Sequence, residues 1–209
     1  MKVLLVDDHA LVRRGVRDLL REAFGDAEFS EAATGEEALS YARKSAFELV
    51  VLDISMPRRG GMDALKQLHA EAPSLPVLIL SHHAEEQYAV RALRAGACGY
   101  LTKDCAVEEL VCAVRKALAG GKYVTEGIAE RLVDMLAGGG QSGAHETLSD
   151  RELQVLRMLA KGRTVKEIAG ELSLSEKTIS TYRTRLLEKT HLRSNAELIR
   201  YALSSGLVD

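Results

Sequence analysis

The chain has 209 residues, of which 46% are hydrophobic and 28% are charged, and its formal net charge is −2 at pH 7. These values are typical of an ordinary globular protein with one or two domains. No apolar stretch approaches the roughly 20 residues that a transmembrane helix needs, and acidic residues interrupt the apolar N-terminal run before it forms a signal pattern. We therefore expect a cytoplasmic protein with no membrane partner.

Charge is distributed unevenly along the chain. Residues 1–120 contain 15 Lys and Arg against 18 Asp and Glu, a net charge of −3. Residues 148–209 contain 11 against 8, a net charge of +3. This asymmetry predicts two domains with different partners. The basic excess is small, so charge alone is weak evidence that the second half binds nucleic acid.

The first half alternates short apolar runs with amphipathic segments. The runs predict buried strands at residues 3–6, 28–31, 49–52, 76–80 and 98–101. The amphipathic segments predict helices at residues 10–24, 35–44, 62–71, 85–95 and 107–119. Five such units in about 120 residues predict an α/β doubly wound, flavodoxin-like domain with strand order 2-1-3-4-5.

Polar residues follow the C-terminal ends of four of these strands. They are Asp7 and Asp8, Asp53, Ser81, and the pair Thr102-Lys103. Taken alone, Asp53 is better interpreted as a turn residue that caps a strand. The expected strand order, however, brings all of these groups to one crevice. Three carboxylates repel one another unless a cation lies among them, and hard oxygen ligands favour magnesium. An aspartate beside magnesium, a lysine and a hydroxyl is a workable phosphoryl acceptor.

Residues 1–120 resemble the receiver domain of bacterial two-component response regulators. The resemblance rests on Asp7-Asp8, on Asp53 in Asp-Ile-Ser-Met-Pro, on Ser81, and on Gly99-Tyr100-Leu101-Thr102-Lys103. It implies that Asp53 is phosphorylated and that Mg²⁺ is held by Asp7, Asp8, Asp53 and the backbone carbonyl of Ser55, with Asp7 acting largely through water. It also implies that Lys103 pairs with the phosphoryl group, that Ser81 moves toward it, and that Tyr100 follows as the switch aromatic. Without the resemblance, Tyr100 is better interpreted as a half-buried strand tyrosine.

Two further features of the first half remain open. His82 stands where relatives usually have a small residue or Met, and it either alters the dephosphorylation rate or lies in a solvent-facing loop. Cys98, Cys105 and Cys112 lack CxxC spacing and histidine partners, so we expect small core or cap residues rather than a metal or redox site.

A linker is expected at residues 121–146. Gly120-Gly121 ends the preceding helix, and Ile128, Leu132 and Leu136 have the spacing of a short helix over residues 128–137. The Gly-rich stretch 138–143 is typical of a flexible tether. The second domain then occupies residues 147–209.

The second domain has the pattern of a small all-α, helix-turn-helix unit. Ser149 and Glu152 predict a capping box that opens a helix to about Lys161. Segments 165–172 and 176–189 predict two helices across a short turn. The second of them presents cations that flank small hydroxyls, namely Lys177, Ser180, Thr181, Arg183, Thr184, Arg185 and Lys189. Such a helix can dock in the major groove, but a solvated basic face of a helical bundle explains the pattern equally well.

This half is similar to the LuxR-type DNA-binding domain. The similarity rests on Leu148–Leu156 (Leu-Ser-Asp-Arg-Glu-Leu-Gln-Val-Leu), on Lys-Glu-Ile-Ala at 166–169, and on Leu-Ser-Glu-Lys-Thr-Ile at 174–179. Together the two resemblances place the chain in the NarL/FixJ class of response regulators. They imply base contacts from Ser180, Thr181 and Thr184 and backbone contacts from Lys177, Arg183, Arg185 and Lys189. One departure is Thr190, where relatives usually carry an apolar residue.

These features predict a DNA-binding response regulator rather than an enzyme. It would receive a phosphoryl group from a sensor histidine kinase, form a homodimer, bind double-stranded promoter DNA and act on transcription by RNA polymerase. One alternative is a receiver that no longer takes phosphate, and the intact acidic pair, Asp53 and Lys103 argue against it. The other is a magnesium phosphohydrolase. Such enzymes usually place a second acid two residues after the nucleophile, where this chain has Ser55.

Overall fold

The computed structural model describes residues 1–56, 61–82, 85–136 and 144–208. It divides the chain into two units, Met1–Ala137 and Gly138–Asp209, and each is described by itself. Across the ranges just given, none of the helices has both the length and the apolar character required to cross a bilayer. The expected tether at 138–143 lies outside the described residues.

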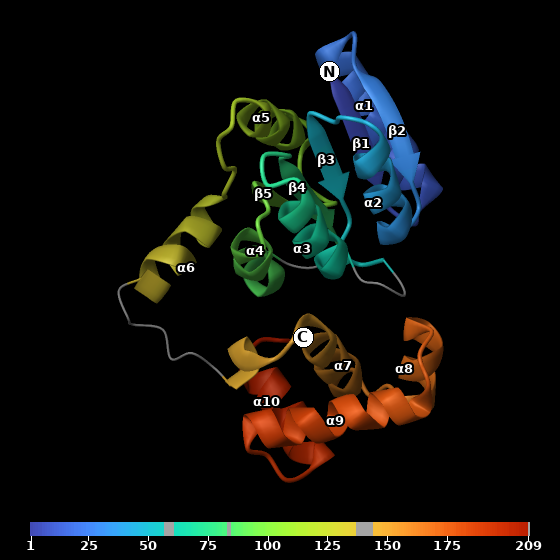
Figure 1. Ribbon diagram of the computed structural model, residues 1–209. Helices are drawn as coiled ribbons and strands as arrows, with labels where there is room; N and C mark the ends of the chain where they lie inside the picture. The colour runs from blue at the N-terminus through green and yellow to red at the C-terminus, as the bar shows by residue number, and fades with distance from the viewer. Residues whose placement is uncertain (57–60, 83–84, 137–143, 209) are drawn as a thin grey trace. The chain divides into compact units, whose positions relative to one another are not determined.

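The first unit is built on five parallel strands in the order β2-β1-β3-β4-β5 (Figure 1). The strands are β1 (Lys2–Val6), β2 (Glu28–Ala32), β3 (Leu49–Leu52), β4 (Val77–Ser81) and β5 (Gly99–Thr102). Every residue of β3 and β4 is buried, because these strands lie inside the sheet and are covered on both faces. The predicted fold class and strand order are confirmed, and strand ends differ from prediction by at most one residue.

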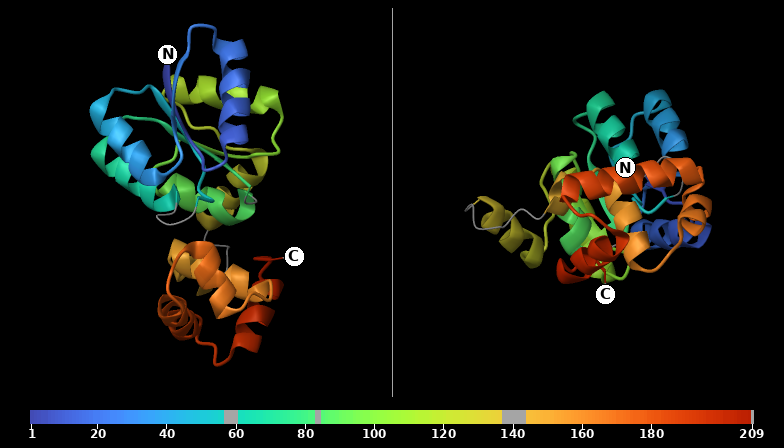
Figure 2. Two further views of the ribbon diagram at one scale, coloured as in Figure 1. Left: turned by 90° about the vertical axis from the view of Figure 1, so that its right-hand side faces the viewer. Right: turned by 90° about the horizontal axis from the view of Figure 1, so that it is seen from below.

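Helices cover both faces of this sheet (Figure 2). They are α1 (Ala10–Phe24), α2 (Gly35–Lys44), α3 (Gly61–Glu71), α4 (Glu85–Arg94) and α5 (Val107–Leu118). One apolar core joins α1 and α5 to the sheet through residues such as Leu20, Val51 and Val114. The linker helix α6 (Glu126–Leu136) packs against α4, so it belongs to the first unit.

In its described residues, 144–208, the second unit contains helices and no strand. They are the 3₁₀ turn η1 (Ala144–Thr147), α7 (Asp150–Ala160), α8 (Val165–Leu172), α9 (Glu176–Thr190) and α10 (Asn195–Ser204). The predicted capping box is present, because the Ser149 side chain accepts from the Glu152 N–H while the Glu152 carboxylate accepts from the Ser149 N–H. The helix-turn-helix is formed by α8 and α9. The sequence pattern did not predict the bounds of α10.

Thr190 ends α9 inside the core of this unit. It is 8% exposed, and its hydroxyl donates to the Leu186 carbonyl at 2.6 Å. A polar group at this buried position is therefore satisfied by the preceding turn of its own helix.

Candidate functional site

The ends of β1, β3, β4 and β5 meet at one edge of the sheet. Val6 lies opposite Leu52 in the parallel register, so Asp7 and Asp53 leave their strands side by side. The Asp53 N–H donates to the Val6 carbonyl and the Lys103 N–H donates to the Ser81 carbonyl, both at 2.8 Å. These bonds continue the sheet by one residue, which holds the polar residues that follow the strands in fixed positions.

Lys103 bridges two of the acidic side chains. Its Nζ lies 2.6 Å from Asp7 Oδ2 and 2.7 Å from Asp53 Oδ2. The side chains of Lys103, Asp7 and Asp53 are 4%, 8% and 0% exposed. Burial by itself would lower the pKa of Lys103, but its hydrogen bonds to Asp53 and Asp7 outweigh that effect and raise the pKa above its ordinary value. The site therefore holds a permanent positive charge between two carboxylates.

The acidic residues also have the chemistry of a metal site. Ligand atoms of Asp7, Asp8, His9 and Asp53 all lie within 4.8 Å of one another. Three carboxylates balanced by one ammonium leave a net negative site, and hard oxygen donors suit Mg²⁺. The residues therefore fit the implied metal. Nothing in the geometry tests the expected contribution of the Ser55 carbonyl, which stays a prediction.

Sequence reasoning missed His9. The backbone N–H of His9 donates to Asp7 Oδ1 at 2.8 Å, and the ring Nδ1 of His9 lies 2.9 Å from Asp8 Oδ1. Its ring stands edge-on to the ring of His82, with centroids 6.5 Å apart. His82 is exposed, as the loop interpretation predicts, but it lies beside the rim of the site. The only available signal was the position of His9 directly after the acidic pair.

Ser81 and Tyr100 are both enclosed in the protein. Each is 0% exposed, so Tyr100 is more deeply buried than the half-buried tyrosine weighed as an alternative. The hydroxyls of Ser81 and Ser55 lie 3.0 Å apart, and the Ser55 N–H donates to Asp53 Oδ1 at 2.8 Å. Ser55 thus connects Asp53 to Ser81. The switch roles of Ser81 and Tyr100 stay predictions.

Gly61 permits a close approach of backbone at this site. A Cβ at this position would overlap the carbonyl oxygen of Asp53 and the Cα of Ile54. The start of α3 can therefore lie directly against the backbone of Asp53 only because Gly61 has no side chain.

In the second unit, α9 carries the residues that sequence analysis assigned to nucleic acid. Lys177, Thr181, Thr184 and Arg185 are exposed, whereas Ser180 and Arg183 are half-buried. The Thr181 hydroxyl donates to the Lys177 carbonyl at 2.9 Å and the Thr184 hydroxyl to the Ser180 carbonyl at 3.1 Å. With the hydroxyls turned toward the helix, the threonine methyls are available for apolar contact.

Two basic residues of α9, Lys189 and Arg183, have contacts or burial that the sequence pattern did not predict. Lys189 Nζ donates to Glu152 Oε2 at 2.7 Å, and Glu152 is 2% exposed. Burial by itself would raise the pKa of Glu152, but hydrogen bonds from Lys189 and Ser149 outweigh it and lower the pKa below its ordinary value. Arg183 Nε is buried and, counting partners among the described residues, makes no hydrogen bond. Contacts of Lys189 and Arg183 with DNA stay predictions.

Comparison with known proteins agrees with this division of the chain. Residues 3–115 match the family described as response regulator receiver domain. Residues 146–202 match the family described as bacterial regulatory proteins, luxR family.

Two curated relatives align with nearly the whole chain. The response regulator UvrY of Escherichia coli (strain K12) is 36% identical over 208 residues, which cover 99% of this chain and 95% of the relative. The response regulator GacA of Pseudomonas aeruginosa is 36% identical over 210 residues, covering 100% and 98%. The structure of RcsB from Salmonella enterica serovar Typhimurium, bound to promoter rprA in the presence of phosphomimetic BeF₃⁻, matches with a TM-score of 0.64. That match is 26% identical and covers 98% of this chain and 99% of the other. The chain therefore belongs to the two-component response regulators of the NarL/FixJ class, which join a receiver domain to a LuxR-type helix-turn-helix domain.

Proposed function

We propose that this chain is a transcription factor switched by phosphorylation of Asp53. A sensor histidine kinase supplies the phosphoryl group in the presence of Mg²⁺, the protein dimerises, and the dimer binds promoter DNA and acts on transcription by RNA polymerase. The observation that carries this proposal is the buried Asp53 carboxylate held by Lys103 beside two further acidic residues. We place the receiver at 1–120, the linker at 121–146 and the DNA-binding domain at 147–209.

The chemistry at Asp53 is transfer of a phosphoryl group between two nucleophiles. A carboxylate oxygen of Asp53 forms the new bond to phosphorus as the bond to the kinase histidine nitrogen breaks. Asp7, Asp8, Asp53 and the Ser55 carbonyl would hold Mg²⁺, which when bound neutralises charge on the phosphoryl oxygens. Lys103 contributes a second positive charge, already directed at Asp53 Oδ2.

The switch follows from the added charge. Ser81 hydrogen-bonds Ser55 in this structure, and moving toward the phosphoryl oxygens requires that this bond break. The movement empties space beside β4 and β5, into which Tyr100 follows. Phosphorylation thereby selects between two arrangements of the Ser81 and Tyr100 side chains on β4 and β5.

The DNA-binding step uses α9 in the major groove. Lys177 and Arg185 are exposed cations suited to phosphates, and Thr181 and Thr184 offer their methyl groups to base edges. Ser180 completes the base-reading set, and Arg183 and Lys189 the backbone set. Two such helices on a two-fold axis read an inverted repeat. The structure of the related RcsB bound to a promoter supports the proposal that this chain binds promoter DNA.

The test is phosphorylation of the full chain by a small phosphodonor with Mg²⁺, followed by intact mass measurement. We expect one phosphoryl group on the natural chain and none on Asp53→Asn. The matched control is Asp63→Asn, which alters an exposed carboxylate on α3 and leaves uptake unchanged. Equal labelling of Asp53→Asn and the natural chain would refute the assignment of the acceptor.

A further inference from the structure

The outer side of the acidic site combines two carboxylates with an imidazole. On the inner side, Lys103 Nζ lies against Asp7 Oδ2 and Asp53 Oδ2. The other oxygen of Asp7, Oδ1, lies 3.3 Å from Nδ1 of His9, and the same nitrogen lies 2.9 Å from Asp8 Oδ1. The side chains of His9 and Asp8 are 61% and 29% exposed, so an ion can reach them from solvent. Two carboxylate oxygens and one imidazole nitrogen therefore lie together at the rim of the site.

The spacing of these donor atoms matches that of ligands around one metal ion. Zinc–ligand bonds of about 2.0–2.2 Å place two ligands about 2.8–3.6 Å apart, for bond angles between about 90° and about 109°. The separations of 2.9 and 3.3 Å from His9 Nδ1 to the two carboxylates fall in this range. An imidazole that only donates a hydrogen bond to Asp8 would have the same spacing, and the variants below separate the two roles.

The start of α1 does not account for a histidine at this position. His9 is the N-cap residue of α1, and among the described residues its side chain makes no capping hydrogen bond. Ser, Thr, Asp and Asn stabilise an N-cap, because their side-chain oxygen accepts from an N–H of the first turn. The backbone N–H of His9 donates to Asp7 Oδ1, and any residue except proline supplies that bond. The imidazole is therefore available for a role at the acidic site.

A second imidazole lies across the rim. The rings of His9 and His82 meet at 89°, with their centres 6.5 Å apart. Two imidazoles on one tetrahedral zinc ion have ring centres about 5 Å apart, given Zn–N bonds of about 2.0–2.1 Å, so a shift of roughly 1–2 Å is needed. His82 is exposed, and a change of its side-chain rotamer can supply that shift. The rim can thus offer the four ligands that a tetrahedral ion requires.

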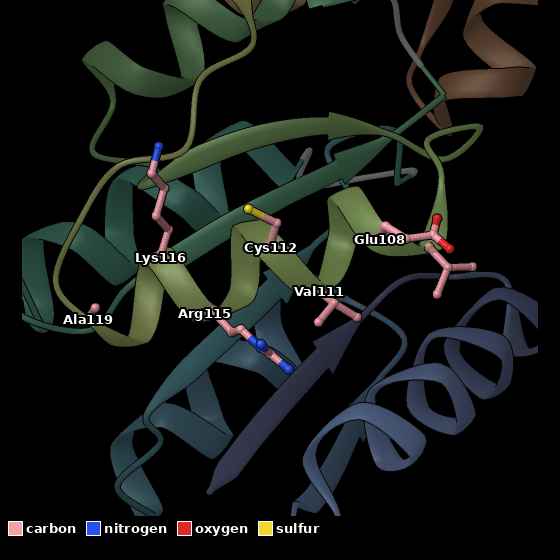
Figure 3. Close-up of a pocket in the computed structure, with 7 residues that line it drawn as sticks. Glu108, Val111, Cys112, Arg115, Lys116 and Ala119 are labelled. Atoms are coloured by element: carbon pink, nitrogen blue, oxygen red, sulfur yellow. The ribbon is translucent and has the colours of Figure 1, made fainter.

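Cysteine does not compete with this set for a transition metal. Across the described residues, the ligating side chains that come together are carboxylates and His9, without a thiol. Burial raises the pKa of Cys98 to about 11, which keeps its thiol protonated. Cys112 is exposed, so its prediction as a core or cap residue is wrong, because α5 packs its opposite face into the core. Figure 3 shows Cys112 between the basic side chains of Arg115 and Lys116, which repel a cation.

We propose that the rim of the acidic site binds a divalent transition-metal ion, represented by Zn²⁺, through two carboxylates and two imidazoles. The four ligands are Asp7, Asp8, His9 and His82. Imidazole suits Zn²⁺, whereas Mg²⁺ prefers oxygen, so the two ions share the carboxylates and differ in their need for the histidines.

Bound Zn²⁺ opposes phosphorylation. It engages the acidic pair that Mg²⁺ needs, and four protein ligands leave no open position for a phosphoryl oxygen. This consequence rests on the proposed function, whereas binding of the ion does not.

The first experiment measures Zn²⁺ binding to the full chain by competition with a chromophoric chelator. We expect His9→Asn to bind Zn²⁺ about tenfold or more weakly than the natural chain. Asn keeps a hydrogen-bond donor for Asp8 and is favoured at the N-cap, so this variant removes only the imidazole. We expect a similar loss in His82→Gln. The matched control is His69→Gln, which alters an exposed histidine on α3 and leaves Zn²⁺ affinity unchanged.

Magnesium binding separates a ligand of Zn²⁺ from a general contributor to the site. The rise in Tm with added Mg²⁺ should give affinities within about threefold of the natural chain in both histidine variants, because Mg²⁺ does not require the imidazoles. His83 lies outside the described residues and is left unchanged in every variant. Zn²⁺ affinity that is unchanged in either His9→Asn or His82→Gln would overturn the four-ligand site and leave the proposed function standing.

The second experiment measures phosphoryl uptake by intact mass, with a small phosphodonor, Mg²⁺ and increasing Zn²⁺. We expect Zn²⁺ to halve uptake by the natural chain at a concentration about tenfold lower than that needed with His9→Asn. Uptake that continues with Zn²⁺ bound would overturn the inhibition. A natural chain that takes up no phosphoryl group with Mg²⁺ alone overturns the proposed function, and the Zn²⁺ titration still decides the metal site.

Discussion

Replacing Lys103 by Met should strongly destabilise the receiver when no divalent metal is present. In the structure its ammonium is shared by Asp7 and Asp53 at 2.6 and 2.7 Å, and all three side chains are at most 8% exposed. Met fills the aliphatic volume but leaves two buried carboxylates without a cation. Removing one partner of a buried ion pair costs about 3–5 kcal/mol. For a unit of this size that cost corresponds to a fall in Tm of roughly 10–20 °C.

Magnesium should restore a large part of this stability. A ligand at about 100 times its Kd stabilises the folded state by about 2.7 kcal/mol. The Lys103→Met variant no longer has an ammonium that competes for the carboxylates, so its stability should rise more steeply with Mg²⁺ than that of the natural chain. The difference between the two proteins therefore narrows as metal is added.

Urea unfolding followed by circular dichroism, first with a chelator and then with Mg²⁺, measures both effects. The matched control is Lys44→Met, which removes an exposed ammonium at the end of α2 and should change the unfolding free energy by less than about 0.5 kcal/mol. If Lys103→Met unfolds within about 1 kcal/mol of the natural chain in chelator, the carboxylates do not depend on Lys103 and the argument from burial is wrong.

Three further predictions concern the switch and the DNA-binding unit. Ser55→Ala removes the hydrogen bond between the Ser55 and Ser81 hydroxyls, which is worth about 0.5–1.5 kcal/mol. The variant should therefore reach half-maximal dimerisation at up to about tenfold less beryllofluoride than the natural chain. An unchanged beryllofluoride midpoint would show that this bond does not restrain the switch. Lys177→Ala should weaken binding to all DNA sequences and reduce the salt slope by about 0.9 per subunit, and a changed sequence preference with an unchanged slope would contradict a phosphate contact. The lowered pKa of Glu152 means that its stabilisation is present above its ordinary pKa of about 4.3 and is lost as the pH falls through the folded-state pKa. Glu152→Gln should therefore melt at a lower temperature than the natural chain at pH 7, and the difference should shrink as the pH falls below the ordinary pKa of Glu. Melting curves that stay parallel at every pH would disprove the linkage.

The sequence by itself determined the architecture and the composition of the candidate site. Continuous apolar runs require strands buried on both faces, and their alternation with helices permits few topologies. Once the strand order is known, Asp7, Asp53 and Lys103 must meet, because parallel strands end at the same edge of the sheet. Helix starts were equally readable, since the Ser149 capping box depends only on residues three positions apart. These features are local, or they follow from strand order alone.

The tertiary structure decided how individual side chains are engaged. Lys189 belongs to an apparently exposed basic stripe, yet it pairs with Glu152, 37 residues away and buried. Arg183 is half-buried with its Nε enclosed, and the Ser55–Ser81 hydrogen bond joins residues that follow or end different strands. Rotamers and pairings of this kind depend on the packing of segments distant in sequence, which periodicity does not encode. The exposure of Cys112 on the outer face of α5 was settled in the same way, because the side of a helix that meets the sheet is chosen by all of the residues packed against it.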